Sequence, residues 1–205
     1  MQRHHDDDVS EMVEVARRAY GHRLAPGTSG NVSVRSHADG DIEFLISASG
    51  TSLGYLQPQD VVPFPSGGMQ DRQPSSEVQL HAALYRVLPR AKALLHYHGT
   101  WTILAAEACA PEKQWRPSLA LPEFAAFAAE SAVGVVPAFT AGSCELAREA
   151  ASCARQFGAW GLILRGHGGI TWGQSPQQAL FHAETLESAA LIDYLISGRK
   201  EISRC

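Results

Sequence analysis

The stretch Ala93-Leu-Leu-His-Tyr-His98 decides the fold around it and carries the first chemical signal. Its apolar start predicts a buried strand. Because side chains alternate between the two faces of a strand, His96 and His98 must point to one face, where two imidazoles can chelate a cation. The His-x-His spacing alone is a weak signal, since nine histidines in 205 residues give about 0.4 such pairs by chance.

A third histidine follows another apolar run. Gly161–Leu164 predicts a strand that leads into Arg165-Gly-His-Gly-Gly169, where glycines on both sides of His167 permit a close backbone approach. A catalytic zinc site needs three protein ligands and one open position. The sequence therefore proposes His96, His98 and His167 as metal ligands. The other six are interpreted as ordinary loop, terminal or helix residues: His4, His5, His22, His37, His81 and His182.

Around these two strands, the sequence predicts a sheet with helices packed on its faces. Helical spacing predicts helices over residues 9–20, 75–87, 100–108, 124–129, 144–157 and 176–196. Further strands are expected at 133–136 and, as a hairpin, at 32–35 and 42–47. Ser76 and Gln79 are spaced as a capping box, residues 4–8 are expected to precede the first helix as a solvated segment, and 111–122 are expected to be irregular. The length favours a single domain over residues 1–205.

The composition excludes several classes of partner. With 17 Lys and Arg against 21 Asp and Glu, the net charge is −4, and no basic run offers a footprint for nucleic acid or an anionic membrane. The first eight residues contain no apolar core, and no stretch of about 18 residues is free of charge and proline, so we expect neither a signal peptide nor a membrane span. The four cysteines form no Cys-x-x-Cys pair, so we expect a cytoplasmic protein with free thiols.

Three segments rich in hydroxyl groups suggest a phosphate site: Thr28-Ser-Gly-Asn31, Ser47-Ala-Ser-Gly-Thr51 and Pro74-Ser-Ser-Glu77. Each offers hydroxyls and backbone N–H groups at a turn or a helix start, which can hold a phosphate without a lysine. Taken singly, each segment is better explained as a plain turn or a helix cap. Together with a metal site they favour a small phosphorylated substrate. Glu77, in the first turn of a predicted helix, is either a stabilising carboxylate or the fourth ligand and proton-transfer group.

Taken in order, these segments resemble the class II aldolase/adducin family, which contains L-fuculose-phosphate aldolase and ribulose-phosphate 4-epimerase. The matching residues are 27–35, 46–50, 74–77 with His81, 93–98, 164–168 and the closing helix with Glu184 and Glu187. The resemblance implies a three-layer α/β/α fold around a mostly antiparallel sheet. It also implies a homotetramer with active sites between subunits.

When the functional residues of the family are matched to this sequence, the resemblance implies zinc as the cofactor, held by His96, His98, His167 and Glu77. It assigns phosphate contacts to Gly30, Asn31, Ser49, Gly50, Ser75 and Ser76. The implied activity is retro-aldol cleavage of a ketose 1-phosphate to dihydroxyacetone phosphate and an aldehyde. Zinc would polarise the carbonyl, and Glu77 would move a proton.

Two departures keep other activities open. The aldolase branch uses two tyrosines for which this chain has no counterpart, since residues 120–125 contain Glu123 and no tyrosine follows Tyr194. A catalytic glutamate at Glu123, together with residues 165–173, resembles methylthioribulose-1-phosphate dehydratase, whereas 137–146 look more like the aldolase. Glu123 is equally explained as an exposed residue at a helix start. The alternatives are thus a dehydratase acting on a 5-substituted ribulose 1-phosphate, and a non-catalytic adducin-like domain, which we would expect to lack the ligands.

Overall fold

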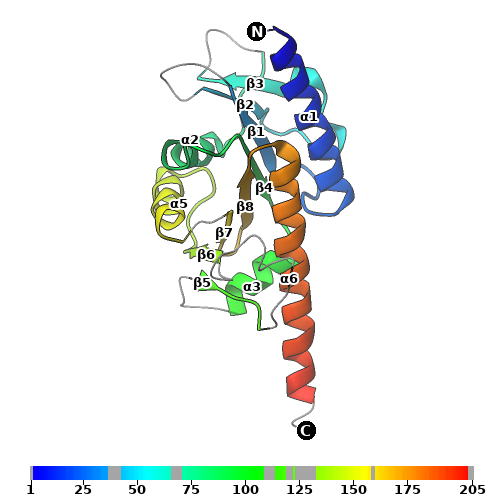
Figure 1. The fold of residues 1–205 in the computed structure, drawn as a ribbon, viewed down its shortest axis with the longest axis vertical. Helices are drawn as coiled ribbons and strands as arrows, with labels where there is room; N and C mark the ends of the chain where they lie inside the picture. The colour runs from blue at the N-terminus through cyan, green and yellow to red at the C-terminus, as the bar shows by residue number, and fades with distance from the viewer. Residues whose placement is uncertain are drawn as a thin grey trace.

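The computed structural model shows an eight-stranded sheet with helices on both faces (Figure 1). It describes residues 2–36, 43–65, 71–108, 114–118, 122, 133–157 and 160–202. The described helices are α1 (Gln2–Gly21), α2 (Val78–Val87), α3 (Thr100–Ala108), α5 (Cys144–Phe157) and α6 (Pro176–Ile202), with short 3-10 turns η1 (Leu53–Tyr55) and η2 (Pro58–Asp60). The strands are β1 (Asn31–Arg35), β2 (Phe44–Ser47), β3 (Val61–Phe64), β4 (Ala93–Tyr97), β5 (Gln114–Trp115), β6 (Val133–Val136), β7 (Gly161–Leu164) and β8 (Gly168–Gly173).

The strand order is β3-β2-β1-β4-β8-β7-β6-β5. Every neighbouring pair is antiparallel except β6 and β7, so the mostly antiparallel sheet expected from the family resemblance is confirmed. β1 and β2 form the predicted antiparallel hairpin. In the centre, β4 is buried along its whole length, because it lies between β1 and β8 and under helices on both faces.

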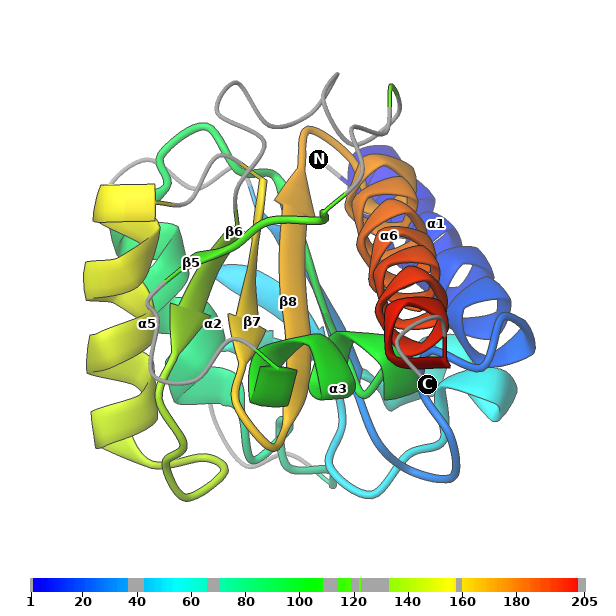
Figure 2. The ribbon, with the colours of Figure 1, turned by 90° about the horizontal axis from the view of Figure 1, so that it is seen from below.

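The helices form the two outer layers. Figure 2 shows α1 and α6 along one face of the sheet and α2 and α5 along the other. Apolar residues of α1, α3 and α6 pack with one face in one core cluster, and those of α2 and α5 pack with the opposite face in a second. Among the described residues, no helix is both long and apolar enough to cross a bilayer.

The sheet register already aligns two of the predicted site segments. Asn31 in β1 lies opposite His96 in β4, and His96 lies opposite Ile170 in β8. The Asn31 segment, expected to bind phosphate, is therefore a direct neighbour of the histidine strand. The turn that carries His167 leads into the strand on the other side.

Three strands are missing from the sequence prediction: β3, β5 and β8, of which β8 lies in the centre of the sheet. Residues 168–173 follow the predicted strand at 161–164 as a glycine-rich run, which reads as a turn, yet they form β8. All six residues are buried, and the strand pairs with both β4 and β7. A Cβ on Gly169 would lie 2.7 Å from ring atoms of Tyr97, so the glycine is needed for close packing and is not a strand breaker here.

Several element boundaries also need correction. Residues 4–8 lie inside α1 and do not precede it, and α6 runs six residues beyond the predicted end at 196. A two-residue strand, β5, lies within the segment expected to be irregular. The predicted helix over 124–129 lies outside the described residues.

The predicted start of α2 is wrong as well. The helix begins at Val78 with Glu77 as its N-cap residue, and no side chain caps it, so Ser76 and Gln79 form no capping box. The preceding residues are tied to the sheet. Pro74 forms a β-bridge with Ala48, and the Ser75 N–H donates to the Ser47 carbonyl.

Candidate functional site

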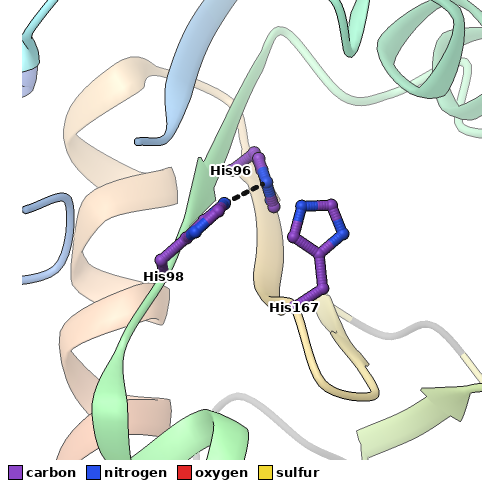
Figure 3. A group of neighbouring side chains, drawn as sticks. All are labelled: His96, His98 and His167. Carbon is purple, nitrogen blue, oxygen red and sulfur yellow. Dashed lines mark hydrogen bonds between the residues drawn. The ribbon is translucent and has the colours of Figure 1, made fainter. Parts of the chain in front are cut away.

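Three imidazoles converge at one end of the central strands (Figure 3). His96 lies in β4, His98 follows the last residue of that strand, and His167 lies in the turn between β7 and β8. One ring nitrogen from each lies within 4.8 Å of the others, and the two Nε2 atoms of His96 and His98 are 3.0 Å apart. The structure thus brings the three predicted histidines into a group that could hold a metal ion.

Backbone contacts fix this arrangement. The His96 Nδ1–H donates to the Gly169 carbonyl at 2.9 Å, which leaves the Nε2 lone pair available as a ligand. Gly168 has a φ of +150°, and a Cβ there would lie 2.0 Å from the Tyr97 carbonyl oxygen. Only glycine therefore lets the His167 turn lie against the end of β4.

The imidazoles are held in their neutral form. Burial lowers the pKa of His98 to about 4, with a further contribution from His167, and burial also lowers the pKa of His167. The pKa of His96 lies well below its usual value, because of burial first and then the neighbouring histidines. Since a metal ligand must be deprotonated, the site favours the form that binds a cation.

Glu77 lies beside the three histidines. Its Oε1 is 3.8 Å from His167 Nε2, and the residue is 4% exposed. Burial raises the pKa of this carboxyl, opposed by the Gly142 backbone N–H. At the start of a helix, the dipole is expected to favour the anionic form of Glu77, but the effect of burial on its pKa is larger. Oε2 is buried and has no hydrogen-bond partner among the described residues, so the carboxylate suits a cation at this place.

A cavity of ≈ 130 Å³ opens beside these groups. It is lined by Thr28, Ser29, Gly30, Asn31, Ala48, Ser49, Gly50, Thr51, Ser75, Ser76, Glu77, His96 and His98. All six residues proposed for phosphate are in this set, and so are three of the four proposed metal ligands. No lysine or arginine occurs among these described lining residues, so the hydrogen-bond donors offered to an anion there are hydroxyl and N–H groups.

The turns come together for local reasons. Gly30 has a φ of +76°, and a Cβ there would lie 2.8 Å from the His96 carbonyl oxygen, so glycine lets this loop reach β4. The Glu77 N–H donates to Ser75 Oγ at 3.2 Å, which folds residues 75–77 into a tight turn. The sequence favoured Ser76 as a helix cap, but Glu77 is the N-cap residue, no side chain caps α2, and Ser76 lines the cavity.

Two contributing residues escaped the sequence prediction. His81 was interpreted as an ordinary helix residue, yet it is fully buried and hydrogen-bonded to Asn31. Its place four residues after Glu77, on the same side of the helix, was the available signal. Gly142, whose N–H faces the Glu77 carboxylate, carried no signal of its own. Glu123 lies outside the described residues.

Comparisons with known proteins agree with this geometry. The family described as "Class II Aldolase and Adducin N-terminal domain" matches residues 10–194. A methylthioribulose-1-phosphate dehydratase from Methylococcus capsulatus is 33% identical over 87% of this chain and 89% of its own length. An L-fuculose phosphate aldolase from Methanococcus maripaludis is 28% identical over 94% and 99%, respectively.

A third relative carries a third activity in its name. The 3-oxo-tetronate 4-phosphate decarboxylase of Escherichia coli is 30% identical over 92% of this chain and 87% of its own length. Among solved structures, the L-fuculose-1-phosphate aldolase of Thermus thermophilus superposes with a TM-score of 0.77 at 26% identity, covering 95% of each chain. On the family match, the 33% identity and the shared fold, the chain belongs to the class II aldolase and adducin family.

Proposed function

We propose that the chain is a metal-dependent lyase for a small sugar phosphate, and that it cleaves a ketose 1-phosphate to dihydroxyacetone phosphate and an aldehyde. The observation that carries the proposal is the shared cavity, which has imidazoles and Glu77 along one part and hydroxyl-rich turns along another. In a ketose 1-phosphate the carbonyl carbon is next to the carbon that bears the phosphate. A cavity of ≈ 130 Å³ suits a short fragment that joins the two groups.

The histidines and Glu77 would hold the metal. His96, His98 and His167 offer neutral nitrogen ligands, and the unpaired Oε2 of Glu77 offers an oxygen. Three histidines with a carboxylate are a donor set typical of zinc. A bound divalent cation would supply Lewis-acid polarisation of the substrate carbonyl.

Glu77 would also move the proton. Bond cleavage next to a carbonyl leaves a carbon that must gain a proton, and the reverse reaction must remove one. A nearly buried carboxyl group with a raised pKa is suited to both steps. We assign the two roles of Oε2 to successive states: it would hold the metal before the substrate binds, and it would move the proton after the substrate oxygens have displaced it.

The turns would hold the phosphate through neutral donors. We assign this role to Gly30, Asn31, Ser49, Gly50, Ser75 and Ser76, all of which line the cavity. Hydroxyls and backbone N–H groups can bind an anion without a basic side chain. This accords with a net charge of −4, since no basic surface is required to capture the substrate.

Dehydration is a second candidate. It is favoured by the 33% identical relative named methylthioribulose-1-phosphate dehydratase. In that reaction Glu123 would act as a second catalytic carboxylate in addition to Glu77. A non-catalytic adducin-like role has less support, because all four candidate metal ligands are present and lie together.

The products separate these reactions. The zinc-loaded protein should be given a panel of ketose 1-phosphates and 5-substituted ribulose 1-phosphates, with and without chelator. Release of dihydroxyacetone phosphate, followed by coupling to glycerol-phosphate dehydrogenase, supports aldol cleavage. Loss of one water without carbon–carbon cleavage, seen by mass spectrometry, supports the dehydratase instead. Release of carbon dioxide from a phosphorylated keto acid would point to the decarboxylase named among the relatives.

Metal analysis tests the cofactor independently. We expect about one tightly bound divalent ion per chain and its loss in His96→Ala, since a catalytic zinc site uses three protein ligands. Less than one ion per chain, unchanged in His96→Ala, would revive the non-catalytic role. We further propose a single domain over 1–205, a cytoplasmic location and a homotetramer with sites between subunits. Light scattering of the purified protein tests the tetramer.

A further inference from the structure

A line of buried hydrogen bonds leads from the cavity into the helix behind it. His81 Nε2 lies 2.6 Å from Asn31 Oδ1, His81 Nδ1 lies 2.6 Å from Ser33 Oγ, and Ser33 Oγ lies 2.9 Å from the Tyr85 hydroxyl. All four residues are at most 5% exposed. The Phe44 ring stacks against the imidazole with centroids 6.5 Å apart, which helps to hold the plane of the ring.

The direction of these hydrogen bonds follows from what each atom can do. An amide oxygen only accepts, so the hydrogen between His81 and Asn31 belongs to His81 Nε2. Burial lowers the pKa of His81 to about 3, so the ring is neutral and carries one hydrogen. Its Nδ1 therefore accepts from the Ser33 hydroxyl, and Ser33 Oγ accepts from the Tyr85 hydroxyl.

This direction decides which end of the Asn31 amide faces the cavity. The oxygen is bound to His81 on the side of α2, so Nδ2 with its two hydrogens lies on the other side. Asn31 lines the cavity beside Ser49, Ser75 and Ser76. Where a cavity offers no described lysine or arginine, an amide N–H₂ attracts an anion and an amide oxygen repels it.

We propose that His81 is a positioning residue that keeps the N–H₂ group of Asn31 directed into the cavity and thereby sets the affinity of the site for a phosphate monoester. The inference rests on the phosphate role assigned in the proposed function. It adds a residue that does not line the cavity and an orientation that the lining residues alone do not determine. A charge-assisted hydrogen bond of this kind corresponds to about 10- to 100-fold in affinity.

The first test reads the hydrogen directly. In the full-length protein labelled with ¹⁵N-histidine, long-range ¹H–¹⁵N spectra should show His81 as the Nε2–H tautomer. His81→Phe or His81→Gln assigns the signal by its loss. A proton on Nδ1 instead would reverse every hydrogen bond in the line, turn the amide oxygen of Asn31 to the cavity, and overturn the proposal. This test needs only the wild-type fold.

The second test measures inorganic phosphate binding by calorimetry on chelator-treated protein, so that no metal takes part. His81→Phe keeps an aromatic ring against Phe44 but has no donor for Asn31, and it should bind phosphate about 10- to 100-fold more weakly than wild type. His81→Gln can still donate an N–H to Asn31 Oδ1 and should bind nearly as wild type. Tyr85→Phe is the matched control, because it loses a buried hydroxyl yet leaves the His81–Asn31 bond intact.

The outcomes distinguish this inference from the lyase proposal. Wild-type affinity in His81→Phe, equal losses in the Phe and Gln variants, or no phosphate binding by the wild type would each overturn the positioning role. The titration involves no turnover. A wild-type protein that binds phosphate but forms no product in the substrate panel therefore contradicts the proposed reaction. It does not contradict the positioning of Asn31 by His81.

Discussion

At the scale of single residues, Glu77 is a buried carboxyl group to which we also assign the proton transfer. Its carboxyl is nearly inaccessible, has a raised pKa and has one oxygen without a described partner. In Glu77→Gln, an amide of the same size cannot exchange a proton at that position. We expect kcat to fall by about 10²- to 10⁴-fold, the usual contribution of a general acid or base.

The same variant should leave the fold intact, because it removes a carboxyl whose burial disfavours its charge and no side-chain cap of α2 depends on it. Thermal unfolding checks this, and kcat is measured on protein whose metal content has been determined. Glu149→Gln, at an exposed position on α5, is the matched control. A Glu77→Gln enzyme that is fully active with full metal content would contradict the assigned proton transfer.

At the scale of elements, the turn between β7 and β8 determines whether the third histidine reaches the site. Gly166 and Gly168 flank His167, and both have positive φ, but only Gly168 is crowded. In Gly168→Ala the new Cβ would meet the Tyr97 carbonyl oxygen at 2.0 Å, so β8 must move away from β4. We expect a loss of more than about 2 kcal/mol in unfolding free energy, together with loss of metal binding.

Gly166→Ala supplies the control for that prediction. A Cβ there would meet no atom within 4 Å, so only the strain of a positive φ remains, at a cost of about 1 kcal/mol. Denaturant titration and metal analysis of both variants give the comparison. Equal effects of the two substitutions would show that backbone strain alone, without the contact at Tyr97, governs this turn.

The N-terminus of α3 depends on a carboxylate from α6. The backbone N–H of Trp101 and that of Thr102 donate to the two Glu187 oxygens at 3.0 and 2.9 Å, and the Thr102 hydroxyl also donates at 2.8 Å. Glu187→Ala leaves these donors without their partner, so we expect about 1–3 kcal/mol of destabilisation. Because His98 lies three residues before Trp101, metal affinity should fall as well. A calorimetric Tm and zinc titration check both effects, with Glu145→Ala on the exposed side of α5 as control.

The elements that the sequence predicts well are those with a regular apolar period. Residues 144–157 and 161–164 have the bounds predicted for them, and residues 93–98 differ by one residue at the end of the strand. β8 was missed because Gly169 fits a strand only against the Tyr97 ring, which lies 72 residues earlier in the chain. The His81–Asn31 hydrogen bond was missed for the same reason, since its partners are 50 residues apart.

At the scale of the whole molecule, the sheet explains why distant motifs form one site. β1, β4 and β8 are neighbours, so Asn31, His96 and the turn carrying His167 meet at one place although they are far apart in sequence. Helices α2 and α6 pack on opposite faces of the sheet, and each supplies a carboxylate. Glu77, the N-cap residue of α2, lines the cavity, and Glu187 of α6 accepts hydrogen bonds from the N-terminus of α3. The family motifs in the sequence identified these residues, but the strand order that joins them became evident only from the structure.

The same burial makes the metal-free molecule sensitive to acid. Burial lowers the pKa of His81 to about 3 and of His98 to about 4, and it also lowers the pKa values of His96, His167 and His182. In the unfolded chain these imidazoles take up protons near pH 6.5. Their contribution to stability is therefore present above pH 6.5 and is lost as the pH falls toward 4. Glu77 and Glu11 act in the opposite sense, because a raised carboxyl pKa favours the folded state at low pH, but they are two carboxyls against five imidazoles.

We therefore expect the unfolding free energy of the chelator-treated protein to fall steeply between pH 6.5 and 4, by about 1.4 kcal/mol per pH unit for each proton taken up on unfolding. Guanidinium titrations at pH 7, 6 and 5 measure it. His98→Gln should flatten the slope, because it removes one of the five imidazoles. A stability that stays constant over this range would mean that the buried histidines take up protons without unfolding, contrary to the neutral site that the proposed metal requires.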